Sequence, residues 1–393
     1  MVEKIKIARV VTAAYVVPWH LNNSISRMTA DFEVFVLGQN VSRNTHMYPD
    51  IKFVDVDINR KGSYFSDVFA LVWLCKFLIL CRPDIVHSIM PKAGLLSAIA
   101  GFVCRVPIRV HTFTGQTWAS KKGLSGRLYW MLDRLVNKLN TICLTDSFSQ
   151  SEFLFGHKIS HAGLPLPVLS KGSLSGVDVT RFRLDGLAES ALQLRTELAI
   201  AKGDVVFAFV ARKTREKGAV DILRAFARVR LAEPNARLLY VGPDEDGVAA
   251  RLRETNPELF HDVTEVGQVT NHEVYLAATD VLCLPSYREG FGSIVIDAAA
   301  LGVPTIGSRI PGLVDAIVDG ETGLLCAAGD IDELAKTMIR FVDDRKLRQV
   351  MGSRARQRVD DFFTADKLYA ALKDFYILNT AKVDKARTWP KIG

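Results

Sequence analysis

Apolar residues along the chain form short β-rich segments that alternate with longer segments of helical pattern. Strands that are continuously apolar and separated by helices are typical of parallel sheets covered on both faces. Two such series follow each other, so the pattern predicts an α/β protein with two doubly wound, Rossmann-like domains. The expected strands are 6–13, 32–38, 84–90 and 108–114 in the first series, and 205–211, 236–242, 280–286, 304–308 and 322–327 in the second.

The boundary between the two series is a segment rich in Gly and Ser, 171–183. We therefore expect a first domain over 1–175 and a second over 176–365. A C-terminal helix and tail, 366–393, would follow, and its packing against the first domain is one possibility. Ligands of open α/β sheets bind outside the carboxyl ends of the strands, so two facing domains would hold a ligand in the cleft between them.

Charge is distributed unevenly over the chain, whose net charge is +7. Residues 1–175 contain 20 Lys and Arg against 11 Asp and Glu, whereas residues 176–393 contain 30 against 32. A basic half suggests an anionic partner such as a membrane surface or a phosphorylated substrate, although a solvated basic surface explains the same excess. The basic residues are dispersed and no nucleic-acid-binding motif is recognised, so nucleic acid is not expected.

Cysteines and acidic clusters give no sign of a disulfide framework or a metal site. The six cysteines form no Cys-x-x-Cys pair, which indicates buried thiols of a reducing compartment. The acidic clusters at 55–57 and 244–246 are expected in turns, and no metal is predicted. The most apolar stretch, 68–81, is too short to span a bilayer and contains Lys76. It is expected to be a core helix, with a face near lipid as an alternative.

The segment 288–307 combines glycines, carboxylates and an apolar helical run directly after a predicted strand. Gly290 and Gly292 permit close backbone approach, and Ser293 is expected to cap the helix that starts there. Glu289 precedes this helix and a second carboxylate lies about one turn inside it. Free N–H groups and the positive end of the helix dipole suit a phosphate or another anionic group.

The composition of this segment suggests three other interpretations. A dinucleotide fingerprint requires a third glycine where the chain has Val295, and the Gly-Lys-Ser/Thr ending of a P-loop is absent. Asp297 could also be a first-turn acidic residue that the helix dipole favours. That last interpretation stays open.

The stretch 286–325 resembles the donor-binding region of family 4 retaining glycosyltransferases, which have the two-domain GT-B fold and use nucleotide sugars without a metal. The family has a Glu, then seven residues, then a second Glu; here these positions hold Glu289 and Asp297. The resemblance implies that Glu289 contacts the sugar ring and that Asp297 holds the ribose diol, with a side chain one methylene shorter. Further donor contacts are implied for Gly290, Phe291, Gly292, Ser293 and, near the base, Val269.

The segment 209–223 resembles the strand–turn–helix in which this family clamps the donor diphosphate. Arg212 and Lys217 match the two cations of that clamp. Two fixed cations can stabilise the charge that develops on a leaving diphosphate without Mg²⁺. An isolated charge run is more often a solvated loop, but this one lies between a buried strand and a helix. Lys213 and Arg215 are expected to be its solvated members.

The segments 83–101 and 109–135 resemble a subset of the family that builds capsules, O-antigens and protein-linked glycans on polyprenyl diphosphate carriers. His111 follows a strand and is expected near the transferred sugar, although a structural histidine is equally compatible with the sequence. Basic residues mixed with Trp118, Tyr129 and Trp130 suit an acceptor diphosphate and anionic headgroups. The basic residues are Lys92, Lys121, Lys122 and Arg127. Alternatively, the aromatic residues pack inside and the lysines are ordinary surface.

The sequence thus predicts a retaining glycosyltransferase that moves an N-acetylhexosamine from a UDP donor to a lipid-diphosphate-linked saccharide, forming an α-linkage. It would work without a cofactor in the cytoplasm, at the inner face of a bacterial plasma membrane. The predicted catalytic residues are Glu289, His111, Arg212 and Lys217. A sugar-nucleotide epimerase and a non-catalytic binding module remain alternatives. The segment 12–24 contains no glycine, unlike many members of the family, which leaves the acceptor contacts there open.

Overall fold

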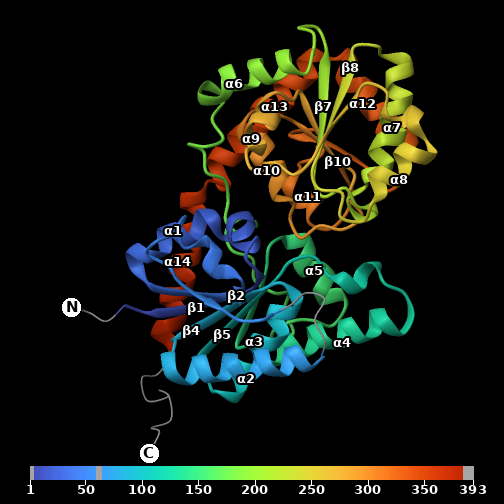
Figure 1. Ribbon diagram of the computed structural model, residues 1–393. Helices are drawn as coiled ribbons and strands as arrows, with labels where there is room; N and C mark the ends of the chain where they lie inside the picture. Colours follow the sequence, from blue (N-terminus) through green and yellow to red (C-terminus); the bar gives the residue numbers. More distant parts are fainter. Residues whose placement is uncertain (1–3, 59–63, 384–393) are drawn as a thin grey trace, which may run out of the picture. The chain divides into compact units, whose positions relative to one another are not determined.

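The structure, a computed structural model, describes residues 4–58 and 64–383 of the chain. The chain divides into two compact units, the first comprising Met1–Gly176 with Ala365–Gly393 and the second Val177–Thr364. Each unit contains a six-stranded parallel sheet with helices on both faces (Figure 1). The predicted fold, an α/β protein of two doubly wound domains, is confirmed.

The sheet of the first unit has the order β3-β2-β1-β4-β5-β6. Every strand expected in this half is present, within one residue at either end. The two edge strands, β3 and β6, were not predicted; β3 has only two apolar residues, which lie between Lys52 and Asp55. The strands are β1 (Lys6–Ala13), β2 (Glu33–Gln39), β3 (Lys52–Asp55), β4 (Ile85–Ile89), β5 (Ile108–Phe113) and β6 (Ile142–Thr145).

Helices cover both faces of this first sheet. On one face α2 and α3 bury apolar side chains against β1, β2 and β4, and α3 lies between α2 and α4 (Figure 1). On the other face α1 and α14 pack against the sheet. The helices are α1 (Asn22–Asp31), α2 (Tyr64–Cys81), α3 (Pro91–Val103), α4 (Gly123–Leu139), α5 (Phe148–Gly156) and α14 (Ala365–Lys382).

A buried polar cluster joins α14 to the centre of the first sheet. The Tyr376 hydroxyl of α14 lies 2.6 Å from Arg9 Nη1 of β1 and 2.6 Å from His87 Nδ1 of β4. His87 Nε2 lies 2.8 Å from the Thr112 hydroxyl of β5. A buried arginine needs such partners, because an unsatisfied buried polar group is costly. The last described helix is therefore an integral part of the first unit.

The sheet of the second unit has the order β12-β11-β10-β7-β8-β9. The unpredicted strand is again at an edge, β9 (Val263–Val266). The other strands are β7 (Val205–Val210), β8 (Ala236–Val241), β10 (Val281–Leu284), β11 (Thr305–Ser308) and β12 (Gly323–Cys326). The helices are α6 (Leu184–Glu197), α7 (Ala219–Ala232), α8 (Val248–Thr255), α9 (His272–Ala277), α10 (Ser293–Ala300), α11 (Leu313–Ala316), α12 (Ile331–Asp343) and α13 (Arg345–Phe362).

Helix α2 contains the apolar stretch that was expected to be a core helix. One side of α2 is buried in the core, and the opposite side is exposed. Leu74 and Leu78 are buried, whereas Phe65, Phe69 and Leu80 are among the most exposed apolar side chains of the described residues. Among the described residues, none of the helices has the length and hydrophobicity that crossing a bilayer requires. The exposed apolar side of α2 therefore faces outward from a unit that has no membrane-spanning helix in its described part.

Candidate active site

The residues predicted to bind the donor lie at the carboxyl ends of β7 and β10, which are neighbours in the second sheet. After β7 the chain passes Arg212 and enters a short 3-10 helix, Arg215–Lys217. After β10 it passes Glu289 and enters α10. The loops that follow neighbouring parallel strands lie at the same edge of the sheet, and ligands of such sheets bind at that edge. The fold thereby brings together Lys217 and Glu289, which are 72 positions apart in the sequence.

Gly218 allows these two loops to touch. Its φ is 74°, and a Cβ atom there would lie 2.1 Å from the carbonyl oxygen of Pro285. Beside this contact the Tyr287 N–H donates to the Glu216 carbonyl at 2.9 Å, and Arg288 Nη2 lies 2.5 Å from Glu216 Oε1. Any larger residue at 218 would push the loops apart, so the glycine is required by both its conformation and the space available.

Glu289 is held by two donors at one carboxylate oxygen. Lys217 Nζ donates to Glu289 Oε1 at 2.6 Å, and the Ser286 hydroxyl donates to the same oxygen at 2.8 Å. Only 10% of the Glu289 side chain and 17% of the Lys217 side chain are exposed. The attraction between charges is stronger in such a poorly hydrated place than in water. A fixed carboxylate and a fixed ammonium group therefore lie side by side at the carboxyl edge of the sheet.

Arg212 is also held by a carboxylate rather than extending freely into solvent. Its Nη1 donates to Glu245 Oε2 at 2.9 Å, and 26% of its side chain is exposed. Arg215 is exposed, as expected. Both predicted clamp cations, Arg212 and Lys217, are thus oriented and partly buried in the second unit.

The start of α10 differs in one detail from the prediction. Gly292, with φ 87°, occupies the N-cap position, Ser293 is the first helical residue, and no side chain caps the helix. The prediction that Ser293 caps the helix is therefore wrong. Ser293 lies one position after the N-cap, and a side chain caps the N–H groups of the first turn from the N-cap position. Gly290 precedes this turn, and the Phe291 side chain is buried against Phe363, with 5.3 Å between ring centroids.

Asp297 lies inside α10 and faces a histidine of α9. His272 Nε2 is 3.6 Å from Asp297 Oδ2, an ion pair when the imidazole is protonated, and the His272 ring packs against Phe182. The neighbouring Glu273 is 2.6 Å from Arg181. Burial raises the pKa of Glu273, but the hydrogen bond from Arg181 outweighs it and the net pKa is lowered. Asp297 thus has a polar partner outside its own helix.

Lys213 was expected to be solvated, and this prediction is wrong. Its side chain is 2% exposed, and its ammonium group lies 2.9 Å from Glu265 Oε1, 3.0 Å from the Val266 carbonyl and over the ring of Tyr240. The reason is that β8 lies beside β7 and β9 beside β8, an order that no local pattern discloses. Lys213 therefore ties the loop after β7 to the end of β9. Val269, the residue expected near the base, follows β9 and is partly buried.

Comparison with known proteins places the chain in a family. Residues 191–358 match the family described as glycosyl transferases group 1. The capsular polysaccharide biosynthesis glycosyltransferase CapM of Staphylococcus aureus is 30% identical over 334 residues, covering 82% of this chain and 83% of CapM. The chain belongs to the group 1 glycosyl transferases. The resemblance to glycosyltransferases of GT-B fold is thereby confirmed.

Two further similarities agree with this family. An Escherichia coli UDP-Gal:α-D-GlcNAc-diphosphoundecaprenol α-1,3-galactosyltransferase is 27% identical over 326 residues, covering 81% of each chain. Among solved structures, Anabaena HepE in complex with UDP has a TM-score of 0.77 at 16% identity, covering 95% of this chain and all of HepE. At that identity the structural similarity concerns the fold alone.

The predicted catalytic histidine of this glycosyltransferase lies inside the first unit. His111 on β5 is 2% exposed, its Nδ1 is 2.9 Å from the Ser88 hydroxyl, and α3 covers its ring closely at Gly94. Burial lowers the pKa of His111 to about 3, so the imidazole is neutral at physiological pH. It can exchange a hydrogen bond but supplies no positive charge. The contact between His111 and the sugar stays a prediction.

The four basic residues proposed for the acceptor do not share one environment. Lys92 at the start of α3 forms an ion pair with Asp67 of α2 at 2.6 Å, whereas Lys121, Lys122 and Arg127 are exposed. The latter three surround the beginning of α4.

The aromatic residues of this region are divided between the interior and the surface. Trp118 is buried, stacks on Phe153 and donates to Asp133 at 2.7 Å. Trp130 donates to the carbonyl of His157, and Tyr129 is exposed beneath the ammonium group of Lys121. The tryptophans therefore support packing, whereas Tyr129 and the three exposed cations belong to the surface.

Acidic side chains near the predicted turns have structural partners. Asp244 accepts N–H groups at the start of α8, and Asp55 accepts from Ser42. Within residues 4–58 and 64–383, no group of His, Cys, Asp and Glu is arranged to hold a metal ion.

Several residues around the site were not singled out in the sequence. Glu245 and Ser286 orient the predicted cation and carboxylate, and only tertiary contacts reveal them, although Ser286 is a polar residue at a strand end. Separately from this site, in the first unit, Tyr15 and Trp19 form an exposed aromatic pair just after β1, with ring centroids 4.9 Å apart. The sequence feature that could have indicated this pair is the spacing of two aromatic residues four positions apart in the loop without glycine.

Proposed function

We propose that this glycosyltransferase transfers an N-acetylhexosamine from a UDP donor to a lipid-diphosphate-linked saccharide, with retention and formation of an α-linkage. The observation that carries the proposal is the position of Glu289, fixed by Lys217 and Ser286 beside the start of α10. This arrangement combines an anion for the sugar with a cation for the departing phosphate.

The donor diphosphate would be bound by Arg212, Lys217 and the N-terminal end of α10. In the described structure Arg212 has Glu245 as its anionic partner and Lys217 has Glu289. Charge-assisted hydrogen bonds from these cations to phosphate are at least as favourable as those to a carboxylate, so the diphosphate can share the cations with Glu245 and Glu289. Departure of UDP builds negative charge on the β-phosphate, and oriented cations stabilise that charge without reorganising. The proposed reaction therefore proceeds without a metal.

The remaining donor contacts are assigned to carboxylates. Glu289 would accept hydrogen bonds from sugar hydroxyls and stabilise positive charge developing at the anomeric carbon. Asp297 would accept from the ribose diol, with His272 limiting the rotation of its side chain. Retention requires the acceptor to attack from the face that the diphosphate leaves. His111 is proposed to bind near the far side of the sugar.

A lipid-linked acceptor is supported by two relatives and by the surface of the first unit. CapM is named for capsular polysaccharide biosynthesis, and the E. coli enzyme is named for a diphosphoundecaprenol substrate. On this chain the exposed cations Lys121, Lys122 and Arg127 would bind the acceptor diphosphate or anionic headgroups.

Helix α4 has the composition of a helix that lies on a membrane surface. Its outward side presents apolar residues at spacings of four, three and four positions, and basic residues flank them. We propose that this side attaches the enzyme to the inner face of the plasma membrane. The apolar residues are Leu124, Leu128, Met131 and Leu135, and the basic ones are Lys121, Lys122, Arg127, Arg134 and Lys138.

The test is incubation with a panel of UDP-sugars and lipid-diphosphate saccharides in EDTA, with product mass and anomeric configuration as readouts. The expected result is acceptor-dependent addition of one N-acetylhexosamine in α-linkage. A changed sugar nucleotide formed without acceptor would support an epimerase instead. UDP binding without turnover on any acceptor of the panel would support a binding module.

A further inference from the structure

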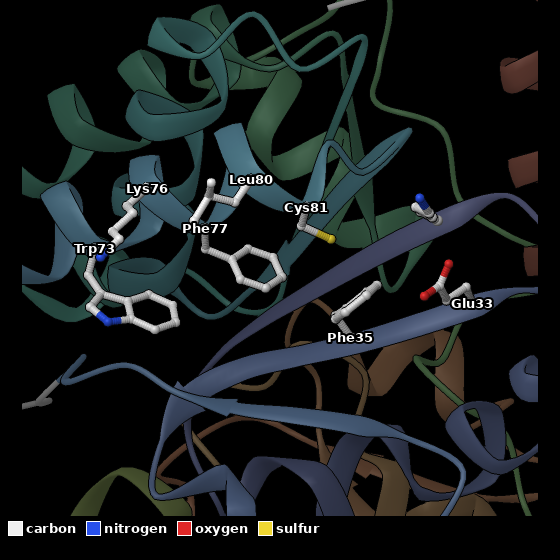
Figure 2. Close-up of a pocket in the computed structure, with 8 residues that line it drawn as sticks. Glu33, Phe35, Trp73, Lys76, Phe77, Leu80 and Cys81 are labelled. Carbon is white, nitrogen blue, oxygen red and sulfur yellow. The ribbon is translucent and has the colours of Figure 1, made fainter.

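A groove of about 500 Å³ lies at the amino ends of β1 and β2, under the last turns of α2. Figure 2 shows Trp73, Phe77 and Leu80 of α2 on one side of this groove and Phe35 and Glu33 of β2 on the other. The donor-binding loops belong to the carboxyl ends of strands in the second unit, so this α2 groove is a separate feature. Its volume is that of a small-ligand site.

Aromatic rings form much of the wall of the α2 groove. The rings of Trp73 and Phe77 are stacked, with centroids 6.0 Å apart and planes 8° apart, and Phe77 meets Phe35 edge-on at 5.6 Å. Burial raises the pKa of the Cys81 thiol in the groove wall to about 11. Such a surface favours an apolar ligand over a hydrated one.

The α2 groove continues into an exposed apolar strip along the same helix. Phe65, Phe69 and Leu80 are each at least 73% exposed, and Val72 lies on the same side. Contiguous apolar surface of this kind marks a protein or membrane interface. Because α3 lies between α2 and α4 over the same sheet, this strip belongs to the helix layer that also carries the apolar side of α4.

Cations surround the mouth of the α2 groove. Lys76 is exposed beside Trp73 and Phe77, and Lys52 lies over the Phe35 ring while its ammonium group pairs with Glu33 at 2.6 Å. The side chain of Lys6 also lines the groove. Long basic side chains can cover apolar surface with their stems and hold an anionic headgroup with their ends.

We propose that the α2 groove binds one hydrocarbon chain of an anionic membrane phospholipid, with Lys76 at its headgroup. The proposal rests on the membrane attachment proposed above and adds a second, chain-binding contact to it. Apolar walls, an open apolar strip and cations at the rim together match a single-chain anionic amphiphile. One buried chain is a marginal anchor alone and becomes an effective one when a second membrane contact, here α4, acts with it.

The groove can be tested with single-chain phosphatidylglycerol that is brominated along its chain, added below its micelle concentration. Bromine quenches a tryptophan only on contact, and Trp73 lines the groove. We expect saturable quenching with one lipid per protein. In Trp73→Phe this quenched component should disappear, whereas Trp19→Phe, which removes an exposed tryptophan elsewhere in the unit, should retain it.

Charge variants separate the groove from general adhesion to lipid. Lys76→Glu should weaken binding of the brominated lipid at least ten-fold. Lys202→Glu makes the same change at an exposed position of the second unit and should alter it less than two-fold. Quenching that persists in Trp73→Phe, equal effects of the two charge variants, or a lipid-free dimer that shields Trp73 would each overturn the proposal.

The proposed transfer reaction is measured separately. Binding of UDP, followed by calorimetry, should be unchanged in Lys76→Glu because the donor residues lie in the second unit. Lipid quenching with no sugar transfer would contradict the proposed function alone. Sugar transfer without Trp73 quenching would contradict the groove alone.

Discussion

Glu289 shows how little of a site residue's environment is local. Its neighbours in sequence supply the Ser286 hydroxyl, but its ammonium partner comes from another loop, held in place by the close contact at Gly218. The carboxylate is therefore positioned by two strands rather than one. Its proposed role is electrostatic, so the charge matters as well as the shape.

Replacing Glu289 by Gln keeps the shape and removes the charge. We expect kcat for sugar transfer to fall about 10²–10³-fold, the usual effect of removing one oriented group at a developing charge. UDP affinity should change much less, because the pyrophosphate contacts remain. Glu321→Gln, an exposed residue of the same unit, is the matched control. Steady-state kinetics with product detection would decide, and unchanged kcat in the Glu289 variant would contradict the site assignment.

Asp297 can be examined in the same assay. Asp297→Asn should weaken UDP binding about ten-fold, since a charge-assisted hydrogen bond contributes about 1.5–3 kcal/mol. Asp297→Glu should bind UDP nearly as well as the parent, because the longer side chain can still accept from the ribose. Calorimetry with UDP and with ribose 5-diphosphate, which lacks the base, measures these affinities. Equal affinities of the parent protein and both variants would indicate that Asp297 only stabilises its helix.

The buried histidines predict a pH dependence of the first unit. Burial lowers the pKa of His87 well below its ordinary 6.5, with Arg9 adding to the effect, and lowers that of His111 to about 3. The unfolded chain takes up protons that the folded unit does not. The free energy of unfolding should therefore be level above pH 6.5 and fall below it, by at most about 1.4 kcal/mol per pH unit for each histidine. Asp133, whose pKa burial raises to about 6, offsets part of this fall.

Urea unfolding between pH 5 and 8 measures that dependence. His111→Asn should reduce the slope below pH 6.5, whereas His261→Asn, at an exposed position of the other unit, should leave it unchanged. A slope independent of both substitutions would mean that other groups control the acid sensitivity.

At the scale of elements, Lys213 connects the loop after β7 to β9 through an ion pair whose ammonium group is buried and whose carboxylate is partly exposed. Burial raises the pKa of Glu265, but the hydrogen bonds from Arg253 and Lys213 outweigh it, so the net pKa is lowered. The pair therefore stabilises the second unit at pH values above the ordinary 4.5 of Glu265. This contribution disappears as the pH falls through the lowered pKa.

Lys213→Met should lower the free energy of unfolding by about 1–2 kcal/mol at pH 7, because two hydrogen bonds from the buried ammonium group are lost while Glu265 keeps Arg253 as a donor. The difference from the parent should shrink below pH 4.5. Arg215→Met, at the neighbouring exposed position, should cost little. Denaturant midpoints at pH 7 and pH 4 are the measurement, and equal loss in both variants would refute the buried role of Lys213.

At the scale of the whole molecule, exposed apolar side chains are concentrated on α2 and α4 of the basic half. We expect Leu124→Glu with Leu128→Glu to reduce cosedimentation with anionic vesicles at least ten-fold, since two leucines lose their burial in lipid. Leu192→Glu with Leu231→Glu makes the matched change on exposed leucines of the second unit and should have no such effect. Vesicle binding that survives the α4 change and fails in the control would place the membrane surface elsewhere.

The sequence by itself determined the fold class and nine of the twelve strands of the described residues, and it placed Arg212 and Glu289 in loops that follow buried strands. Long apolar strands and a glycine-bounded helix carry local signals, because burial on both faces and left-handed backbone conformations restrict residue choice directly. The three described strands that escaped prediction are all at sheet edges and four residues long, and β3 and β9 contain exposed residues.

Only the tertiary structure decided which charged residues are partners. Lys213 and Arg215 look alike in sequence, yet one is buried beneath β9 and the other is exposed, and Glu245 and His272 became visible only through their contacts. It also showed that Trp118 packs inside while the leucines of α4 point outward. Periodicity reports which side of an element is apolar, but the elements that cover that side, and the polar groups they bring with them, depend on how distant segments pack.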